Sequence, residues 1–304
     1  MLSASRRKPR RPFGRTARTL VAASARDRRS RAEVSEVAQP RPGDEQRTIP
    51  LTEVLKLERL DRLLFRSLHR VEVDRSLYGG QVLGQALLAC GATVDADRHP
   101  HSLHGYFLRR GNGAEPVVFR VDNDRDGKSY SARRVVALQD GAVIFNMSAS
   151  FRTVAEGEER TTAHAVSPTA PQQCPTVTPD PGLALVARVQ EWSGAEKCFP
   201  SRFWVRPNCE LPQGDPLLHA AAIAYMSDYS TGLRRTVVAE VLGPSLDHAL
   251  WFHRTPRWDD WLFVDHGSGV SGGGRGWYPG SIIDCGEGEI VASLAQEMAY
   301  RVRR

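Results

Sequence analysis

The sequence predicts an α+β fold built from two copies of one unit, in each of which an antiparallel sheet curls around a central apolar helix. Three observations lead to this prediction. Segments recur in the same order in two parts of the chain, an apolar helix opens each copy, and a meander of strands follows each helix. With 304 residues and 41% hydrophobic composition, the chain can bury a core of this size.

The repeat is visible in three blocks. HGYFLRR, which begins at His104, returns as HALWFHR from His248, with His first, Arg seventh and an apolar run between. GQALLACGAT, from Gly84, matches HAAAIAYMSD, from His219, and DGAVIFNMSASF resembles GEGEIVASLAQEM. Because the blocks keep their order while loops of different length separate them, we interpret them as a duplicated unit.

The helix of the second copy has a well-marked start. Asp215 can act as its N-cap and Pro216 suits its first turn, so Leu217 to Met226 should be helical. Apolar or small side chains occupy every face, which predicts that other structure wraps the helix. Asp228 at its far end is unusual, because a partly desolvated carboxylate is costly unless hydrogen-bond donors meet it.

The first copy should continue with four strands, the middle two joined by a turn at Asp126 and Gly127. These strands are expected over residues 103–109, 116–122, 129–138 and 142–153. The chain then divides into a basic tail, a first unit, a connection rich in Pro, Thr, Glu and Gln, and a second unit. The corresponding ranges are 1–48, 49–153, 154–195 and 196–304.

The net positive charge of the chain comes from the tail. The first 50 residues carry 13 Lys and Arg against 5 Asp and Glu, whereas the rest of the chain carries 28 against 30. Such a tail fits a transit peptide, a disordered arm that binds nucleic acid, or sequence upstream of the true start, and we favour the last. From the folded body we expect no binding of nucleic acid.

Two other classes are disfavoured. Five cysteines without a C-x-x-C pair argue against a disulfide framework and a zinc site. DNDRDG, from Asp122, resembles the opening of an EF-hand loop, but Arg133 occupies the twelfth position, so we interpret it as a hairpin turn. No run of 18 apolar residues occurs. We therefore predict no metal, no cofactor and no membrane association, and a reducing, cytoplasmic location.

Three polar residues of the second copy are candidates for chemistry. Asp228 ends the helix, Ser245 lies just before the strand that begins at Leu250, and Gln296 lies within the last strand. In the first copy the positions of Asp228 and Gln296 hold Thr93 and Ala149. The repeat therefore predicts that only the second copy is equipped for catalysis.

From about Val54 to Arg301 the chain resembles the TesB-type acyl-CoA thioesterases II, which are built as a double hotdog. The resemblance rests on YGGQVLGQAL, HSLHGYFLRRG, DGKSYSARRVVALQDGAVIFNMSASF, SLDHALWFHR and VASLAQEMAYR. It implies hydrolysis of fatty acyl-CoA to free fatty acid and CoA, a role in fatty acid and lipid metabolism, and a catalytic triad of Asp228, Ser245 and Gln296.

The chemistry of these side chains agrees with that implication. Thioester hydrolysis needs a water held near the carbonyl carbon and a base to take its proton, and Asp228 in a partly buried position can be that base. Ser245 and the uncharged amide of Gln296 can orient the water, so no covalent acyl-enzyme is needed. The CoA phosphates require cations, for which the candidates are Arg109, Arg110, Arg254 and Arg275.

Two alternatives remain. A catalytically weak protein that binds or senses acyl-CoA would be favoured if the acid were missing. A hotdog acyl-CoA hydratase would use a His beside an Asp or Glu; we place His248 on a loop, and His219 near the start of the helix, which fits less well. Because hotdog sheets present faces and edges that pack against other copies, we also expect a homo-oligomer, dimer or tetramer.

Overall fold

The computed structural model describes eight ranges of the chain. They are residues 48–70, 75–154, 167–177, 182–192, 199–237, 240–254, 261–286 and 288–302. The predicted basic tail, apart from its last residue, lies outside these ranges, as does much of the predicted connection.

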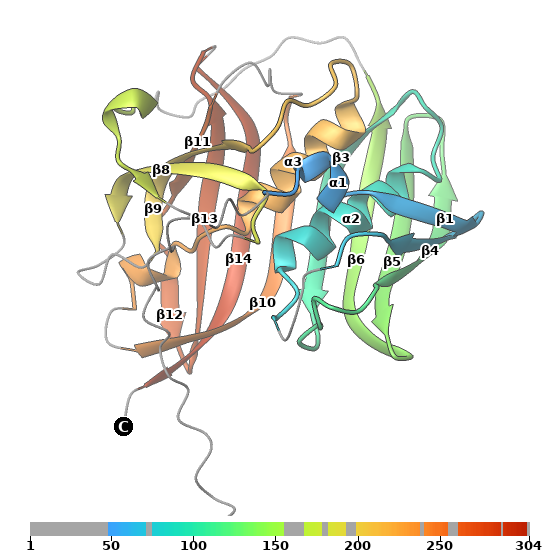
Figure 1. The fold of residues 1–304 in the computed structure, drawn as a ribbon, viewed down its shortest axis with the longest axis horizontal. Coiled ribbons are helices and arrows are strands. Elements are labelled where there is room, and N and C mark those ends of the chain that lie inside the picture. The colour runs from blue at the N-terminus through green and yellow to red at the C-terminus, as the bar shows by residue number, and fades with distance from the viewer. Residues whose placement is uncertain are drawn as a thin grey trace, which may run out of the picture. The chain divides into compact units, whose positions relative to one another are not determined.

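A single antiparallel sheet runs through the described part of the chain (Figure 1). Its first-half strands are β1 (Leu57–Asp61), β2 (Leu64–Ser67), β3 (Arg98–Phe107), β4 (Val118–Asp126), β5 (Tyr130–Gln139) and β6 (Ala142–Thr153). Its second-half strands are β7 (Thr176–Val177), β8 (Leu185–Trp192), β9 (Pro200–Pro207), β10 (Glu240–Phe252), β11 (Leu262–His266), β12 (Val270–Gly272), β13 (Arg275–Asp284) and β14 (Glu289–Val302).

The order of the strands is the same in both halves when it is followed outward from the centre. The first half runs β3, β6, β5, β4, β2, β1, and the second runs β10, β14, β13, β11, β9, β8, β7. The two sheets join where β3 pairs with β10, Leu103 opposite Leu250. The predicted double hotdog is therefore confirmed, with its two sheets fused edge to edge into one.

The α-helices lie against one face of this sheet (Figure 1). They are α1 (Leu51–Val54), α2 (Gly79–Gly91) and α3 (Pro216–Ser227), and the described chain also forms two short 3₁₀ helices, η1 (Pro171–Gln173) and η2 (Leu233–Arg235). The start of α3 is as predicted: Pro216 is in its first turn, and the Asp215 carboxylate accepts from the Leu218 N–H at 2.9 Å. Its central residues, Ala220 to Met226, are buried, as expected for a helix without a polar face.

Small residues let α2 and α3 run antiparallel at close range. A Cβ added to Gly80 would lie 2.2 Å from the Tyr225 carbonyl oxygen, and one added to Gly84 would lie 2.9 Å from that of Ala221. No larger residue fits at such a contact unless the backbones shift. The N-terminus of α2, in the first half, therefore meets the C-terminus of α3, where Asp228 lies.

Two predicted segments can be compared with the structure. The Asp126–Gly127 turn forms as expected, with the Gly127 N–H donating to Tyr130 O at 2.9 Å. The predicted connection contains β7 and β8, and β8 buries Leu185 and Ala187 against the core. Buried and partly exposed residues alternate along the first part of β8, and β8 pairs with β9 of the second sheet. The composition of this segment alone did not reveal that alternation.

Candidate active site

Asp228 follows the last residue of α3 and is largely buried, with 11% of its side chain exposed. Burial raises the pKa of this carboxyl to about 6, while hydrogen bonds from the Gln296 amide and the Gly80 backbone N–H act in the opposite direction. The carboxylate is thus ionised at neutral pH and more basic than an ordinary Asp.

Gln296, buried in β14, connects the other two predicted residues. Its Nε2 donates to Asp228 Oδ1 at 2.9 Å and to Ser245 Oγ at 2.8 Å. Ser245 lies inside β10, which starts at Glu240, so the predicted position before the strand is wrong; it stands between two register shifts of the β10–β14 pair. Such irregularities redirect side chains. The structure therefore brings Asp228, Ser245 and Gln296 together.

Sequence reasoning missed one neighbour of these side chains, Tyr278, and misplaced another, His248. Tyr278, fully buried in β13 and opposite Gln296, donates its hydroxyl to Gln296 Oε1. His248 was expected on a loop, but it is buried in β10 with Nδ1 3.8 Å from Asp228 Oδ1 and Nε2 2.9 Å from Ser227 Oγ. Burial, reinforced by nearby His266, lowers the pKa of His248 to about 3, so this imidazole is neutral.

The first half contributes the turn that faces the carboxylate. Gly80, in the first turn of α2, donates its N–H to Asp228. A Cβ added to Gly79 would lie 2.6 Å from Asp228 Oδ2 and 3.0 Å from the Phe107 ring. The missing side chain at Gly79 therefore keeps Oδ2 accessible, and the positive end of the α2 dipole lies beside it.

A cavity of about 460 Å³ reaches Asp228 and Ser245. Most of its walls come from the first half and are apolar, and they include Leu77, Val82, Phe107, Ile144 and Phe145. Two predicted cations, Arg109 and Arg110, also line it, and Arg109 Nη1 donates to Val143 O at 2.6 Å. Candidate catalytic side chains of the second half thus face a cavity built largely by the first half.

The other two predicted cations lie elsewhere. Arg254, beyond the opposite end of β10 from Ser245, is ion-paired with Glu289 at 2.8 Å and lines a different cavity. Arg275 begins β13 and pairs with Glu297 at 3.2 Å. Among the described residues that line the cavity at Asp228, neither of them occurs. The sequence offered them as cations, but their positions in the sequence could not show where their side chains end.

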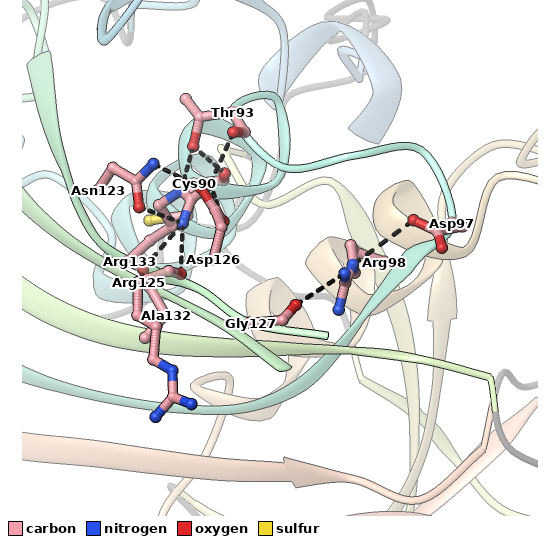
Figure 2. Close-up of polar contacts among 10 residues, drawn as sticks. All are labelled: Cys90, Thr93, Asp97, Arg98, Asn123, Arg125, Asp126, Gly127, Ala132 and Arg133. Carbon is pink, nitrogen blue, oxygen red and sulfur yellow. Dashed lines mark hydrogen bonds and ion pairs between the residues drawn. The ribbon is translucent and has the colours of Figure 1, made fainter. Parts of the chain in front are cut away.

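The first half contains a counterpart of this site. Arg133 pairs with Ala149 across β5 and β6 as Tyr278 pairs with Gln296 across β13 and β14. Figure 2 shows the buried Arg133 guanidinium among its partners: Nε donates to Thr93 Oγ1 at 2.9 Å and Nη1 to Asn123 Oδ1 at 2.8 Å. Arg133 therefore fills the space that the candidate site residues occupy in the second half.

Within the ranges that the structure describes, no cluster of three or more His, Cys, Asp or Glu side chains could hold a metal ion. None of the described helices is long and apolar enough to cross a membrane.

This architecture, with a carboxylate, an amide and a hydroxyl gathered at the junction of two fused hotdog units, is that of a hotdog thioesterase. Residues 69–152 match the acyl-CoA thioesterase N-terminal domain family and residues 156–300 the C-terminal domain family. The chain therefore belongs to the TesB-type acyl-CoA thioesterase II family and is a thioester hydrolase.

Individual relatives agree with this assignment. Human acyl-coenzyme A thioesterase 8 is 34% identical across 86% of this chain and 92% of the relative. Acyl-CoA thioesterase 2 of Haemophilus influenzae is 29% identical across 83% of this chain and 96% of its own length. The crystal structure of an acyl-CoA thioesterase II from Mycobacterium marinum is 38% identical, with a TM-score of 0.68 over 83% of this chain and 97% of that one.

Proposed function

We propose that the protein hydrolyses fatty acyl-CoA by direct attack of a water held by Asp228, Ser245 and Gln296. One observation carries the proposal: Gln296 Nε2 donates at once to Asp228 Oδ1 and Ser245 Oγ, at the end of an apolar cavity. A base must lie within hydrogen-bond reach of the water it deprotonates, and Asp228 and Ser245 both line that cavity.

The reaction can be written with these groups. The water oxygen bonds to the thioester carbon while Asp228 takes its proton; the carbon–sulfur bond then breaks, and the CoA sulfur leaves and receives a proton. Negative charge develops on the carbonyl oxygen during attack. The first turn of α2 next to Gly79 supplies the positive end of a helix dipole at which such charge is stabilised.

The cavity fits the two ends of the substrate. Its apolar walls suit an acyl chain, and Arg109 and Arg110 provide cations for the CoA phosphates. Hydration remains the weaker alternative even though His248 lies near Asp228. A hydratase histidine must reach the substrate, and His248 is fully buried and absent from the described residues that line the cavity.

The test is the release of free CoA from a panel of acyl-CoAs, short to long, by the wild type and by Asp228→Asn. Loss of the base should lower the rate by ~10²- to 10⁴-fold while acyl-CoA still binds. A wild type that binds acyl-CoA and releases no CoA would instead support the sensing alternative. Deleting residues 1–48 should leave hydrolysis intact.

Assembly and location are further parts of the proposal. Four large aromatic side chains on sheet strands are exposed: Tyr106, Tyr130, Trp251 and Trp277. Such a surface supports a homo-oligomer, dimer or tetramer. Light scattering that gave the monomer mass of 33.7 kDa would contradict it. A cytoplasmic location stays a prediction, since a yeast relative at 22% identity is named a peroxisomal acyl-coenzyme A thioester hydrolase.

A further inference from the structure

The Gln296 side-chain amide can donate to Asp228 and Ser245 in only one of its two flipped orientations. A glutamine amide presents an acceptor oxygen on one side and a donor nitrogen on the other. As placed, Nε2 faces Asp228 Oδ1 and Ser245 Oγ. If the amide were flipped, Oε1 would face the carboxylate, and two acceptors would repel each other. Something must therefore select the orientation.

Tyr278 is the group in contact with the other side of the amide. It is fully buried, stands opposite Gln296 in the β13–β14 pair, and donates its hydroxyl to Oε1. The only other acceptor recorded for this hydroxyl in the described structure is Ser230 O at 3.5 Å, the limit for a hydrogen bond.

The direction of the Tyr278 proton is itself fixed. The Thr231 side chain and the Gly232 backbone N–H, both on the loop that follows Asp228, hydrogen-bond with the phenol and lower its pKa, against the larger raising effect of burial. An oxygen whose lone pairs receive donors must direct its own proton elsewhere, and Gln296 Oε1 is the acceptor in reach. The loop, the phenol and the amide form one directional chain.

We propose that Tyr278 is a positioning residue that holds the Gln296 amide with its nitrogen toward Asp228 and Ser245. Because Ser245 Oγ then accepts from the amide, its own O–H stays available to the cavity that it lines. This inference rests on the proposed function, for which Tyr278 never touches the substrate.

The test compares Tyr278→Phe with a matched control, Tyr225→Phe. Tyr225 is equally buried, and its hydroxyl accepts from the Ala184 N–H at 2.9 Å, so the control also removes a buried hydroxyl, but one outside the site. Both variants should lose stability. Only Tyr278→Phe should lower kcat, by ~10-fold at nearly constant KM. Equal kcat in the two variants would overturn the proposal.

A double-mutant cycle asks whether Tyr278 acts through Gln296. If it does, Tyr278→Phe lowers kcat in the wild-type background and has no further effect on Gln296→Ala, because the residue it positions is gone. The same fold loss in both backgrounds would show an effect independent of the amide and would overturn the proposal.

A last measurement separates this inference from the proposed function. Titration of the Asp228 carboxyl by ¹³C NMR needs no turnover, and loss of the oriented amide donor should move its pKa upward in Tyr278→Phe and leave it unchanged in Tyr225→Phe. If the wild type hydrolyses acyl-CoA but Tyr278→Phe leaves the pKa of Asp228 unchanged, the positioning role alone is overturned. A shifted pKa in a protein without hydrolysis overturns the proposed function and keeps the positioning role.

Discussion

The two ends of the α2–α3 helix pair are surrounded by equivalent strands, but different side chains fill the space between the helices and those strands. At one end Asp228, Gln296 and Tyr278 leave an accessible carboxylate beside a cavity. At the other, Arg133 extends into the equivalent space and bonds Thr93 and Asn123. The comparison shows that a duplicated fold does not carry its chemistry with it: a few side chains on matching strands decide whether the space is a site or part of the core.

Making the active end resemble the inactive one should have the largest effect. Gln296→Ala copies Ala149, and it removes the donor shared by Asp228 and Ser245. We expect kcat to fall by ~10²- to 10³-fold, as when one preorganised donor is lost. Steady-state kinetics check this, with Ala149→Ser as the control that leaves the rate unchanged. A loss below about threefold would be incompatible with the amide's proposed role.

The free-energy cost of burying the ionised Asp228 carboxylate can be measured through the stability of the fold. Its pKa is raised from 3.8 to about 6, so the folded state binds this proton more tightly than the unfolded chain. Stability from this group is present below about pH 4 and is lost as the pH rises through about 6. Asp228→Asn should therefore raise the free energy of unfolding at pH 8 by up to about 3 kcal/mol.

Denaturant unfolding of wild type and Asp228→Asn at pH 4 and pH 8 checks this expectation. The difference between the two proteins should shrink at the lower pH, where the folded wild-type carboxyl is protonated and no longer carries a buried charge. A difference that is the same at both values would show that burial does not penalise this carboxylate.

At the inactive end the same kind of change should affect stability and not rate. Arg133→Met keeps an apolar stem of similar length but leaves Thr93 O and Asn123 Oδ1 without the guanidinium. We expect a loss of about 1 to 3 kcal/mol in unfolding free energy with kcat unchanged. Thermal unfolding beside a rate assay measures both. A tenfold fall in kcat would mean that the two ends are coupled.

The smallest predicted effect concerns the glycine that faces the acid. Gly79→Ala would place a methyl group 2.6 Å from Asp228 Oδ2, and we expect kcat to fall by ~10-fold as the water and the carboxylate are displaced. Gly272→Ala is the matched control, since no atom lies within 4 Å of the Cβ it would add. Equal rates for the two variants would contradict the position given to the water.

Much of this site could be predicted from the sequence. The cap at Asp215, the apolar helix and the repeat placed Asp228 and Gln296 correctly, because periodicity and caps are local signals. Tyr278 was missed because it follows a glycine-rich run, a composition that disfavours strands, whereas the structure makes Arg275–Asp284 a strand. Its partner is fixed by strand register, which is a long-range property.

The candidate arginines for the CoA phosphates show a second limit of prediction from the sequence. Arg110 and Arg254 are equivalent in the repeat, yet Arg110 lines the cavity and Arg254 pairs with Glu289. Among the described residues that line the cavity, Arg109 and Arg110 of the first half lie at the end of the strand nearest the candidate catalytic side chains of the second half. A sequence repeat predicts that equivalent positions have the same backbone structure, but it does not predict which residues each side chain will contact.

The contact between α2 and α3 also bears on how such a chain can change during evolution. The half without the acid supplies Gly79 and Gly80, whose missing side chains set how near its helix comes to Asp228. The half that lacks the acid is therefore constrained at these two positions. Under the proposed function, selection on the reaction acts on both halves of the chain, and an unrelated domain could not replace the first half without changing the surroundings of Asp228.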